Sequence, residues 1–122
     1  MVEVKRGEVW VARLSSAQRG KVGKTRPVLI IQDDLFIQEN PETLIVLPLT
    51  SQIRSGIRHL RVRLPIRDRL LMESHVILEK PMTLDRRRFG EGPLAALTND
   101  EMTAVERGLL AVMGMADYLP DL

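Results

Sequence analysis

The sequence has no cysteine, few aromatic residues and no long hydrophobic run. Its 122 residues include only two Phe, one Trp and one Tyr. The lack of thiols excludes disulfide frameworks, zinc–cysteine sites and cysteine nucleophiles, and it favours a reducing compartment, so we expect a cytoplasmic protein. Apolar runs such as residues 28–31 fall far short of the about 20 residues that cross a membrane. The charged N-terminus lacks the apolar stretch of a signal peptide.

No internal repeat, low-complexity tract or Gly/Ser linker divides the chain. A length of 122 residues is typical of one domain, so we expect a single unit spanning residues 1–122. The apolar content of 44% is enough for one core. A domain of this size buries only about two-thirds of its unfolded surface, and dimerisation would therefore stabilise it.

The modest net charge of +2 conceals an uneven charge distribution. Residues 1–32 carry seven Lys or Arg against two acids, and residues 54–88 carry ten against four. The intervening residues 33–53 hold four acids, and residues 89–122 hold six acids against one base. Two basic blocks favour an anionic partner such as a nucleic acid, although strand faces exposed to water also carry arginine.

The patterning predicts a mainly β protein with a C-terminal helix. Five stretches have strand composition: residues 8–14, 27–32, 43–49, 58–64 and 72–79. In the last of these, alternation places Val76 and Leu78 on one face and Glu73, His75, Ile77 and Glu79 on the other. Asp33 and Asp34 are expected to cap a short helical turn, and residues 83–89 to form a short helix. About five short strands with one terminal helix fit a small, strongly curved barrel of the α+β class.

The C-terminal helix has the clearest signals. Thr98 and Glu101 form a capping box at its start. An apolar stripe at helical spacing follows, and we expect it to pack on the sheet: Met102, Val105, Leu109, Val112 and Met113.

Several catalytic signatures fail on inspection. Gly23-Lys24-Thr25 resembles the end of a phosphate-binding P-loop, but Gln18 stands where that motif needs glycine, and a strand follows instead of a helix. The two histidines are far apart in sequence with no third ligand spaced for a metal, so no metal site is expected. No nucleophile elbow occurs. Any chemistry must therefore use arginine, carboxylate and hydroxyl groups.

Three segments, in order and at matching spacing, resemble the successive signatures of the MazF/PemK toxin family: residues 5–10 (KRGEVW), 24–31 (KTRPVLII) and 46–52 (VLPLTSQ). The resemblance continues through residues 76–79 (VILE) and 83–85 (TLD) to the terminal helix. It implies an SH3-like barrel, and a homodimeric toxin of a toxin–antitoxin pair. It also implies an endoribonuclease that cuts single-stranded RNA without a cofactor.

Carried onto this sequence, the resemblance places the catalytic arginine at Arg26, the catalytic threonine at Thr50 and, in some members, a carboxylate at Glu79. Metal-free RNA cleavage by the 2′-hydroxyl needs a base, an acid and stabilisation of phosphate charge. The forked guanidinium of arginine suits the last of these. The alternatives are a structural ion pair for Arg26, a turn hydroxyl for Thr50 and a surface carboxylate for Glu79.

Further residues are expected to contact RNA rather than to react. They are Arg19, Lys21, Lys24, Thr25, Ser51, Gln52 and Lys80. Most of the cations lie in a glycine-containing loop that could grip phosphates. Lys80 and Met82 depart from the family pattern, which has Gln and Arg there, so substrate contacts at this place differ from those of many relatives.

The resemblance also implies a cognate antitoxin whose acidic, partly disordered tail covers the basic groove. Two other functions remain open on the same fold. One is a CcdB-like gyrase poison, although the chain lacks the Trp-Gly-Ile ending of those toxins. The other is an RNA-binding barrel without catalysis, which would protect RNA instead of cutting it.

Overall fold

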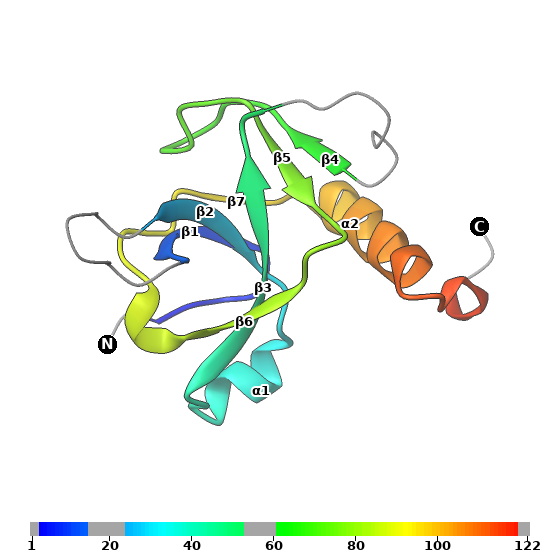
Figure 1. The fold of residues 1–122 in the computed structure, drawn as a ribbon, viewed down its shortest axis with the longest axis horizontal. Helices are drawn as coiled ribbons and strands as arrows, with labels where there is room; N and C mark the ends of the chain where they lie inside the picture. Colours follow the sequence, from blue (N-terminus) through cyan, green and yellow to red (C-terminus); the bar gives the residue numbers. More distant parts are fainter. Residues whose placement is uncertain (1–2, 15–23, 53–60, 120–122) are drawn as a thin grey trace.

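The computed structural model describes residues 3–14, 24–52 and 61–119, which form one curled antiparallel sheet and a C-terminal helix (Figure 1). The strands are β1 (Glu8–Arg13), β2 (Thr25–Ile30), β3 (Thr43–Thr50), β4 (Arg61–Leu64), β5 (Ser74–Ile77), β6 (Met82–Asp85) and β7 (Ala95–Ala96). The α-helices are α1 (Asp34–Gln38) and α2 (Asn99–Val112), with 3₁₀ turns at Arg86–Arg88 and Ala116–Tyr118. Within these residues no helix is long and apolar enough to span a membrane.

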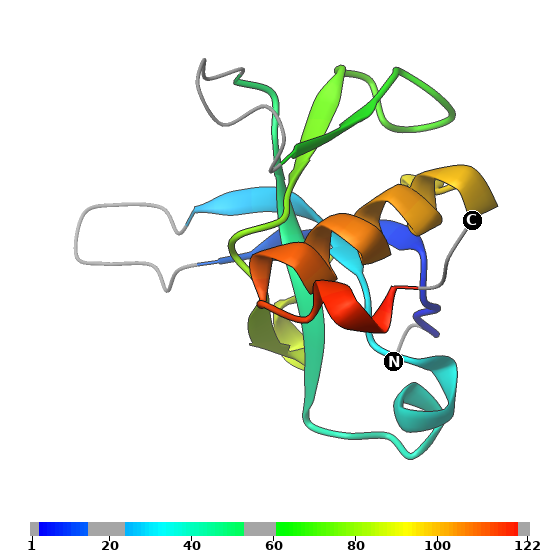
Figure 2. The ribbon, with the colours of Figure 1, turned by 90° about the vertical axis from the view of Figure 1, so that its right-hand side faces the viewer.

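β3 is the central strand of the sheet. The strand order is β4-β5-β3-β2-β1-β7, and β6 pairs with β3 off this path. One edge of β3 pairs with β2, while the other pairs first with β6 and then, at its C-terminal end, with β5. The shared strand therefore joins two parts of the sheet that curl into a half-barrel (Figures 1 and 2).

Both faces of β2 and β3 are buried, each in its own core. Leu29 and Leu47 face a cluster that includes Met102 and Val105 of α2, the helix that crosses this face in Figure 2. The alternate residues face a second cluster that contains Trp10, only 1% exposed. Burial on both faces explains why these strands read as continuous apolar runs instead of alternating patterns.

The KRGEVW segment builds a turn and fixes the tryptophan. Gly7 has a φ of +89°, a conformation that favours glycine. The Glu8 carboxylate accepts hydrogen bonds from the Lys5 backbone N–H at 2.8 Å and from Trp10 Nε1 at 3.1 Å. This segment therefore has a structural role, because it anchors the start of β1 in the core.

The short helix expected over residues 83–89 is wrong. Residues Met82–Asp85 form β6, where Leu84 and Thr83 pair with Leu44 and Ile45 of β3, and only Arg86–Arg88 make a 3₁₀ turn. Asp85 begins that turn by accepting a hydrogen bond from the Arg87 N–H at 2.8 Å. Pairing with the edge of β3 outweighs the local preference of this short, polar stretch.

The helix start is confirmed, and the apolar stripe is confirmed only in part. Thr98 and Glu101 form the capping box, and Asp33 caps α1. Met102 and Val105 are buried against the sheet, but Val112 and Met113 are 36% and 50% exposed. The stripe therefore runs on beyond the sheet that it was expected to cover.

The last predicted strand is shorter than expected, because β5 spans Ser74–Ile77 instead of residues 72–79. β4 is described from Arg61 to Leu64, and residues 58–60 of its predicted range lie outside the described residues. The predicted faces are confirmed, because Val76 and Leu78 enter the core. The opposite face of these strands carries the half-buried His75.

Candidate functional site

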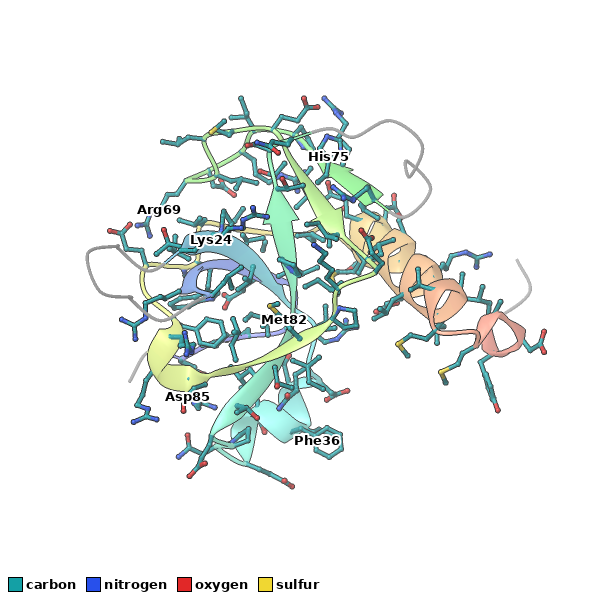
Figure 3. The ribbon with its side chains drawn as sticks, in the orientation of Figure 1. Lys24, Phe36, Arg69, His75, Met82 and Asp85 are labelled. Atoms are coloured by element: carbon teal, nitrogen blue, oxygen red, sulfur yellow. The ribbon has the colours of Figure 1, made fainter. Side chains whose placement is uncertain are left out.

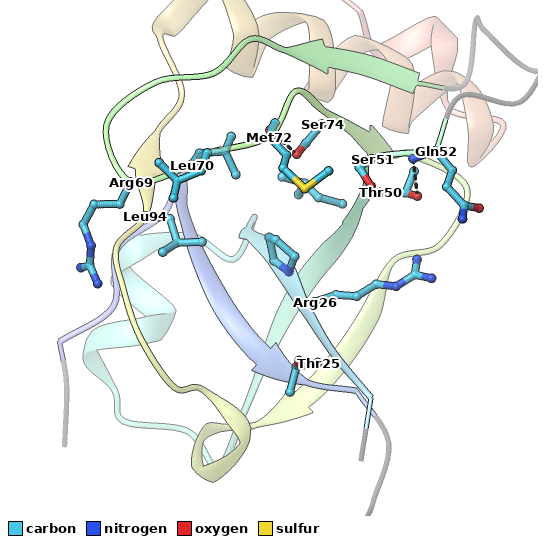
Figure 4. A pocket seen from close by; sticks show the side chains of 13 residues that line it. Thr25, Arg26, Thr50, Ser51, Gln52, Arg69, Leu70, Met72, Ser74 and Leu94 are labelled. Carbon is cyan, nitrogen blue, oxygen red and sulfur yellow. Dashed lines mark hydrogen bonds between the residues drawn. The ribbon is translucent and has the colours of Figure 1, made fainter. Parts of the chain in front are cut away.

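A pocket of about 390 Å³ opens between the start of β2, the end of β3 and the chain that precedes β5 (Figure 4). Three segments and one more residue line it: residues 25–27, residues 49–52, residues 69–72 with Ser74, and Leu94. Five of its seven polar side chains come from the start of β2, the end of β3 and the two residues that follow β3. The second and third family-like segments of the sequence thus meet at one cavity.

The sheet register brings Arg26 and Thr50 to the same side. Val28 of β2 pairs with Pro48 of β3, and continuing this antiparallel register by two residues sets Arg26 opposite Thr50. The ladder ends before that point, where Pro27 and Pro48 have no N–H to donate. Figure 4 shows the Arg26 side chain on the same side of the pocket as Thr50. Both side chains therefore line the same pocket.

Arg26 is half-buried and has no acidic partner. Among the residues that the structure describes, no carboxylate lies within ion-pair distance of its guanidinium. The structural ion pair considered as an alternative is therefore not found there. The guanidinium keeps its forked donors for an anionic ligand, which is the geometry that binds phosphate in two-point fashion.

Thr50 has its hydroxyl oriented by the backbone. Its Oγ1 accepts a hydrogen bond from the Gln52 N–H at 3.1 Å (Figure 4). This is the turn contact considered as the alternative role of this residue. A hydroxyl is also a donor, and an acceptor contact leaves its O–H free to point elsewhere. The turn therefore fixes the side chain without using the hydrogen that a phosphate oxygen would accept.

Glu79 lies apart from this pocket. It follows β5, and its Oε1 accepts a hydrogen bond from Arg61 at 3.5 Å. It is absent from the pocket lining. The structure does not bring Glu79 together with Arg26 and Thr50. Its neighbour Lys80 is exposed.

The expected RNA-contacting residues are divided by the structure. Thr25, Ser51 and Gln52 line the pocket and are exposed. Lys24 immediately precedes β2, is exposed and engages another group of the chain (Figure 3). Arg19 and Lys21 lie outside the described residues.

One wall of the pocket was missed by the sequence analysis. It is formed by Arg69, Leu70, Leu71, Met72, Ser74 and Leu94. Arg69 pairs with Glu91 at 3.3 Å, and the Ser74 hydroxyl donates to the Met72 carbonyl at 2.9 Å. No sequence signal marked this wall, because residues 69–72 belong to no regular element and reach the pocket only through the fold.

His75 was also missed. Its register partner on β3 is Thr50, so both side chains stand on the same face. Alternation in the sequence placed His75 on the polar face of its strand, but only the strand pairing shows which residue it faces. Within the described residues, no three His, Cys, Asp or Glu side chains are grouped to hold a metal ion.

Comparison with known proteins matches the chain to one toxin family and to solved structures of similar fold. A family model described as the PemK-like, MazF-like toxin of type II toxin–antitoxin systems matches residues 5–113. The fold also resembles MazF in a MazE–MazF structure from Deinococcus radiodurans, with a TM-score of 0.75 at 20% identity over 94% of this chain and 99% of that one.

Two further structures come from mycobacterial species. One is an endoribonuclease, with a TM-score of 0.73 at 20% identity over 98% of both chains. The other is an endoribonuclease in complex with its cognate antitoxin, with a TM-score of 0.72 at 20% identity over 98% of this chain and 99% of that one. At such identities the likeness shows a shared fold.

Proposed function

The chain belongs to the PemK-like, MazF-like family of type II toxins, and on that premise we propose that it is a metal-independent endoribonuclease that cuts single-stranded RNA. One observation carries the proposal. The fold sets the guanidinium of Arg26, which has no acidic partner among the described residues, on the same side of a pocket as the oriented hydroxyl of Thr50. An RNA phosphate is an anionic ligand that fits between them. The structural relatives named as endoribonucleases support the same chemistry.

The reaction is attack of the 2′-hydroxyl on the adjacent phosphorus. Its products are a 2′,3′-cyclic phosphate and a 5′-hydroxyl. Negative charge gathers on the nonbridging phosphate oxygens during attack, and donors fixed before the reaction stabilise it most effectively. Arg26 supplies charge and two parallel donors, and Thr50 supplies one neutral donor. Glu79 is the candidate base taken from the family pattern, and it could serve only where the RNA reaches across the face of β5.

The RNA strand is expected to run over the exposed edge of the pocket. Thr25, Ser51 and Gln52 offer polar groups there, and Lys24 lies next to it. Arg19 and Lys21 would add charge from the preceding loop, and Lys80 from the end of β5. Contacts of this kind position the backbone, whereas base edges must be read by other groups.

The toxin is proposed to act as a cytoplasmic homodimer, and a cognate antitoxin is its proposed inhibitor. A relative of the same fold is known in complex with its antitoxin, which supports such a partner. An acidic, partly disordered tail would neutralise the basic groove and cover the pocket. Electrostatic binding of this kind weakens as salt rises, so an affinity independent of ionic strength would contradict it.

The test is to incubate the purified protein with a long mixed-sequence RNA in excess EDTA and to map 5′-hydroxyl ends. We expect discrete cuts that share a short sequence. Arg26→Ala should fold and remove them, while Arg107→Ala, on α2 and outside the pocket, should keep them. Intact RNA with the unaltered protein, or full cleavage by folded Arg26→Ala, would overturn the proposal. Gyrase inhibition and RNA protection would then be measured.

A further inference from the structure

We propose that His75 is the general acid of the reaction, giving its proton to the 5′ oxygen that leaves the phosphorus. The inference rests on the proposed endoribonuclease activity and adds a residue that no family-like segment of the sequence marked as reactive. Arg26 and Thr50 stabilise charge, but neither is suited to supply a proton near neutral pH, whereas imidazole is.

The strand pairing places His75 next to Thr50, which lines the pocket, although His75 itself is not among the lining residues. β3 lies between β2 and β5, and Thr50 is the register partner of His75. Side chains opposed in this way have Cβ atoms about 4.5–5.5 Å apart. Thr50 therefore stands between Arg26 on one side and His75 on the other. A phosphate held by Arg26 and Thr50 would turn one of its in-line oxygens toward β5.

The imidazole has an unused nitrogen. His75, labelled in Figure 3, lies on β5 and is half-buried. Its Nε2 is buried and has no hydrogen-bond partner in the part of the chain that the structure describes. Buried polar atoms are nearly always paired, so such an atom needs an explanation, and a catalytic role is one of the few available. A nitrogen that bonds no protein group is free to bond a substrate atom.

The charged neighbours of His75 are paired with one another, although Arg61 Nε and Glu79 Oε2 are, among the described residues, also buried without a hydrogen-bond partner. On β4, Arg63 lies opposite His75 and bonds Glu73, while Arg61 bonds Glu79. On the β3 side the register partner is the neutral Thr50. Arg61 and Arg63 thus each contact a carboxylate, and no acidic group of residues 3–14, 24–52 or 61–119 holds the imidazole in an ion pair.

The proton and electron balance is simple. The O2′–P bond forms as the 2′-hydroxyl loses its proton to solvent, and the P–O5′ bond breaks with its electron pair leaving on O5′. The imidazolium of His75 donates its proton to O5′, which departs as the 5′-hydroxyl. The neutral imidazole then regains a proton from water. Such assistance by a positioned acid is worth about 10²–10⁴-fold in rate.

The test compares two substrates that carry the sequence mapped by the RNA cleavage assay. One is an ordinary oligoribonucleotide, and the other has sulfur in place of the 5′ bridging oxygen at the cut site. A thiolate leaves without being protonated because a thiol is much more acidic than an alcohol. We expect His75→Gln to lower kcat on the ordinary substrate by about 10²–10⁴-fold and to cut the sulfur substrate within about tenfold of the unaltered protein. Thr50→Val, which removes a phosphate contact, should slow both substrates alike.

The outcomes separate the inference from the proposed function. If the unaltered protein cuts neither substrate, the endoribonuclease proposal fails and the role of His75 fails with it. If the unaltered protein cuts both substrates, two results overturn only the assignment of His75. One is that His75→Gln lowers kcat equally on both substrates, and the other is that it leaves kcat on the ordinary substrate unchanged. The melting temperature of His75→Gln should match that of the unaltered protein, and His75→Asn provides a second variant if the first fails to fold.

Discussion

Arg67 donates two hydrogen bonds to the carboxylate of Glu101, one of them from Nη1 to Oε1 at 2.6 Å, and so ties the chain after β4 to the first turn of α2. Each side chain is about one-fifth exposed, at 21% and 19%. Glu101 also accepts a hydrogen bond from the Thr98 N–H at 2.9 Å as part of the capping box. One carboxylate therefore caps the helix and docks it on the segment that leads into the pocket wall.

Breaking this pair should destabilise the fold. We expect Arg67→Ala to lower the free energy of unfolding by about 1–2 kcal/mol, because it leaves a largely buried carboxylate with fewer donors. Glu101→Gln keeps an acceptor for Thr98 and removes the charge, so it isolates the ionic part. Urea denaturation at pH 7 measures both variants. An Arg67→Ala protein as stable as the original would show that the pair contributes nothing.

The same pair predicts a dependence on pH. The hydrogen bonds from Arg67 lower the pKa of Glu101, with burial opposing them. A carboxyl whose folded pKa lies below its unfolded value stabilises the fold above the unfolded value, about 4.3, and loses that contribution as the pH falls through the folded value. The stability difference between the original protein and Glu101→Gln should therefore be full at pH 7 and shrink below about pH 4. A constant difference would contradict this.

Asp85 is a second carboxyl group whose pKa is lowered by an arginine. Arg87 donates to its carboxylate from Nε at 3.0 Å and Nη2 at 2.9 Å, and these bonds, with one from the Arg87 backbone, lower the pKa of Asp85 to about 2. We expect carbon-13 NMR titration of the carboxyl to report this value. Arg87→Ala should raise it toward the ordinary value of about 3.9. Arg88→Ala, which removes only a distant charge, should move it much less.

Gly92 is required by close packing against the core tryptophan. A Cβ at this position would lie 2.2 Å from Cδ2 of Trp10, whose side chain is 1% exposed and has no room to shift. We expect Gly92→Ala to cost about 2–3 kcal/mol of stability. Gly90→Ala is the matched control, since its Cβ would meet only the Val11 carbonyl at 3.8 Å. Equal melting temperatures for the two variants would show that the site adapts.

Local signals in the sequence predicted the elements well where one pattern dominated. The Thr98 capping box, the Asp33 cap and the alternation of Val76 and Leu78 are each set by neighbours within a few residues, and all are confirmed. The helix expected over residues 83–89 failed because a strand partner on β3, distant in sequence, decides that segment. Strand pairing of this kind leaves no local trace in a short polar stretch.

The candidate site was likewise predicted only where local sequence signals marked its residues. Family-like segments marked Arg26 and Thr50, and the structure lines one pocket with both. They gave no sign of His75 or of the wall formed by residues 69–72, because a register between strands brings the first to the site and an irregular segment brings the second. Glu79, assigned from the pattern alone, lies outside that pocket.

The last prediction concerns the shape of the Arg26 side chain rather than its charge. If two parallel donors hold the phosphate, Arg26→Lys keeps the charge but loses the fork. We expect Arg26→Lys to retain RNA binding at low salt and to lower kcat by about 10²-fold, close to the effect of Arg26→Ala. Thr50→Ser, which keeps the hydroxyl, should stay within about tenfold of the original while Thr50→Val falls about 10²-fold. Single-turnover cleavage separates these effects from binding. Near-normal kcat in Arg26→Lys would mean that Arg26 acts as a simple positive charge, and the two-point contact with the phosphate would have to be abandoned.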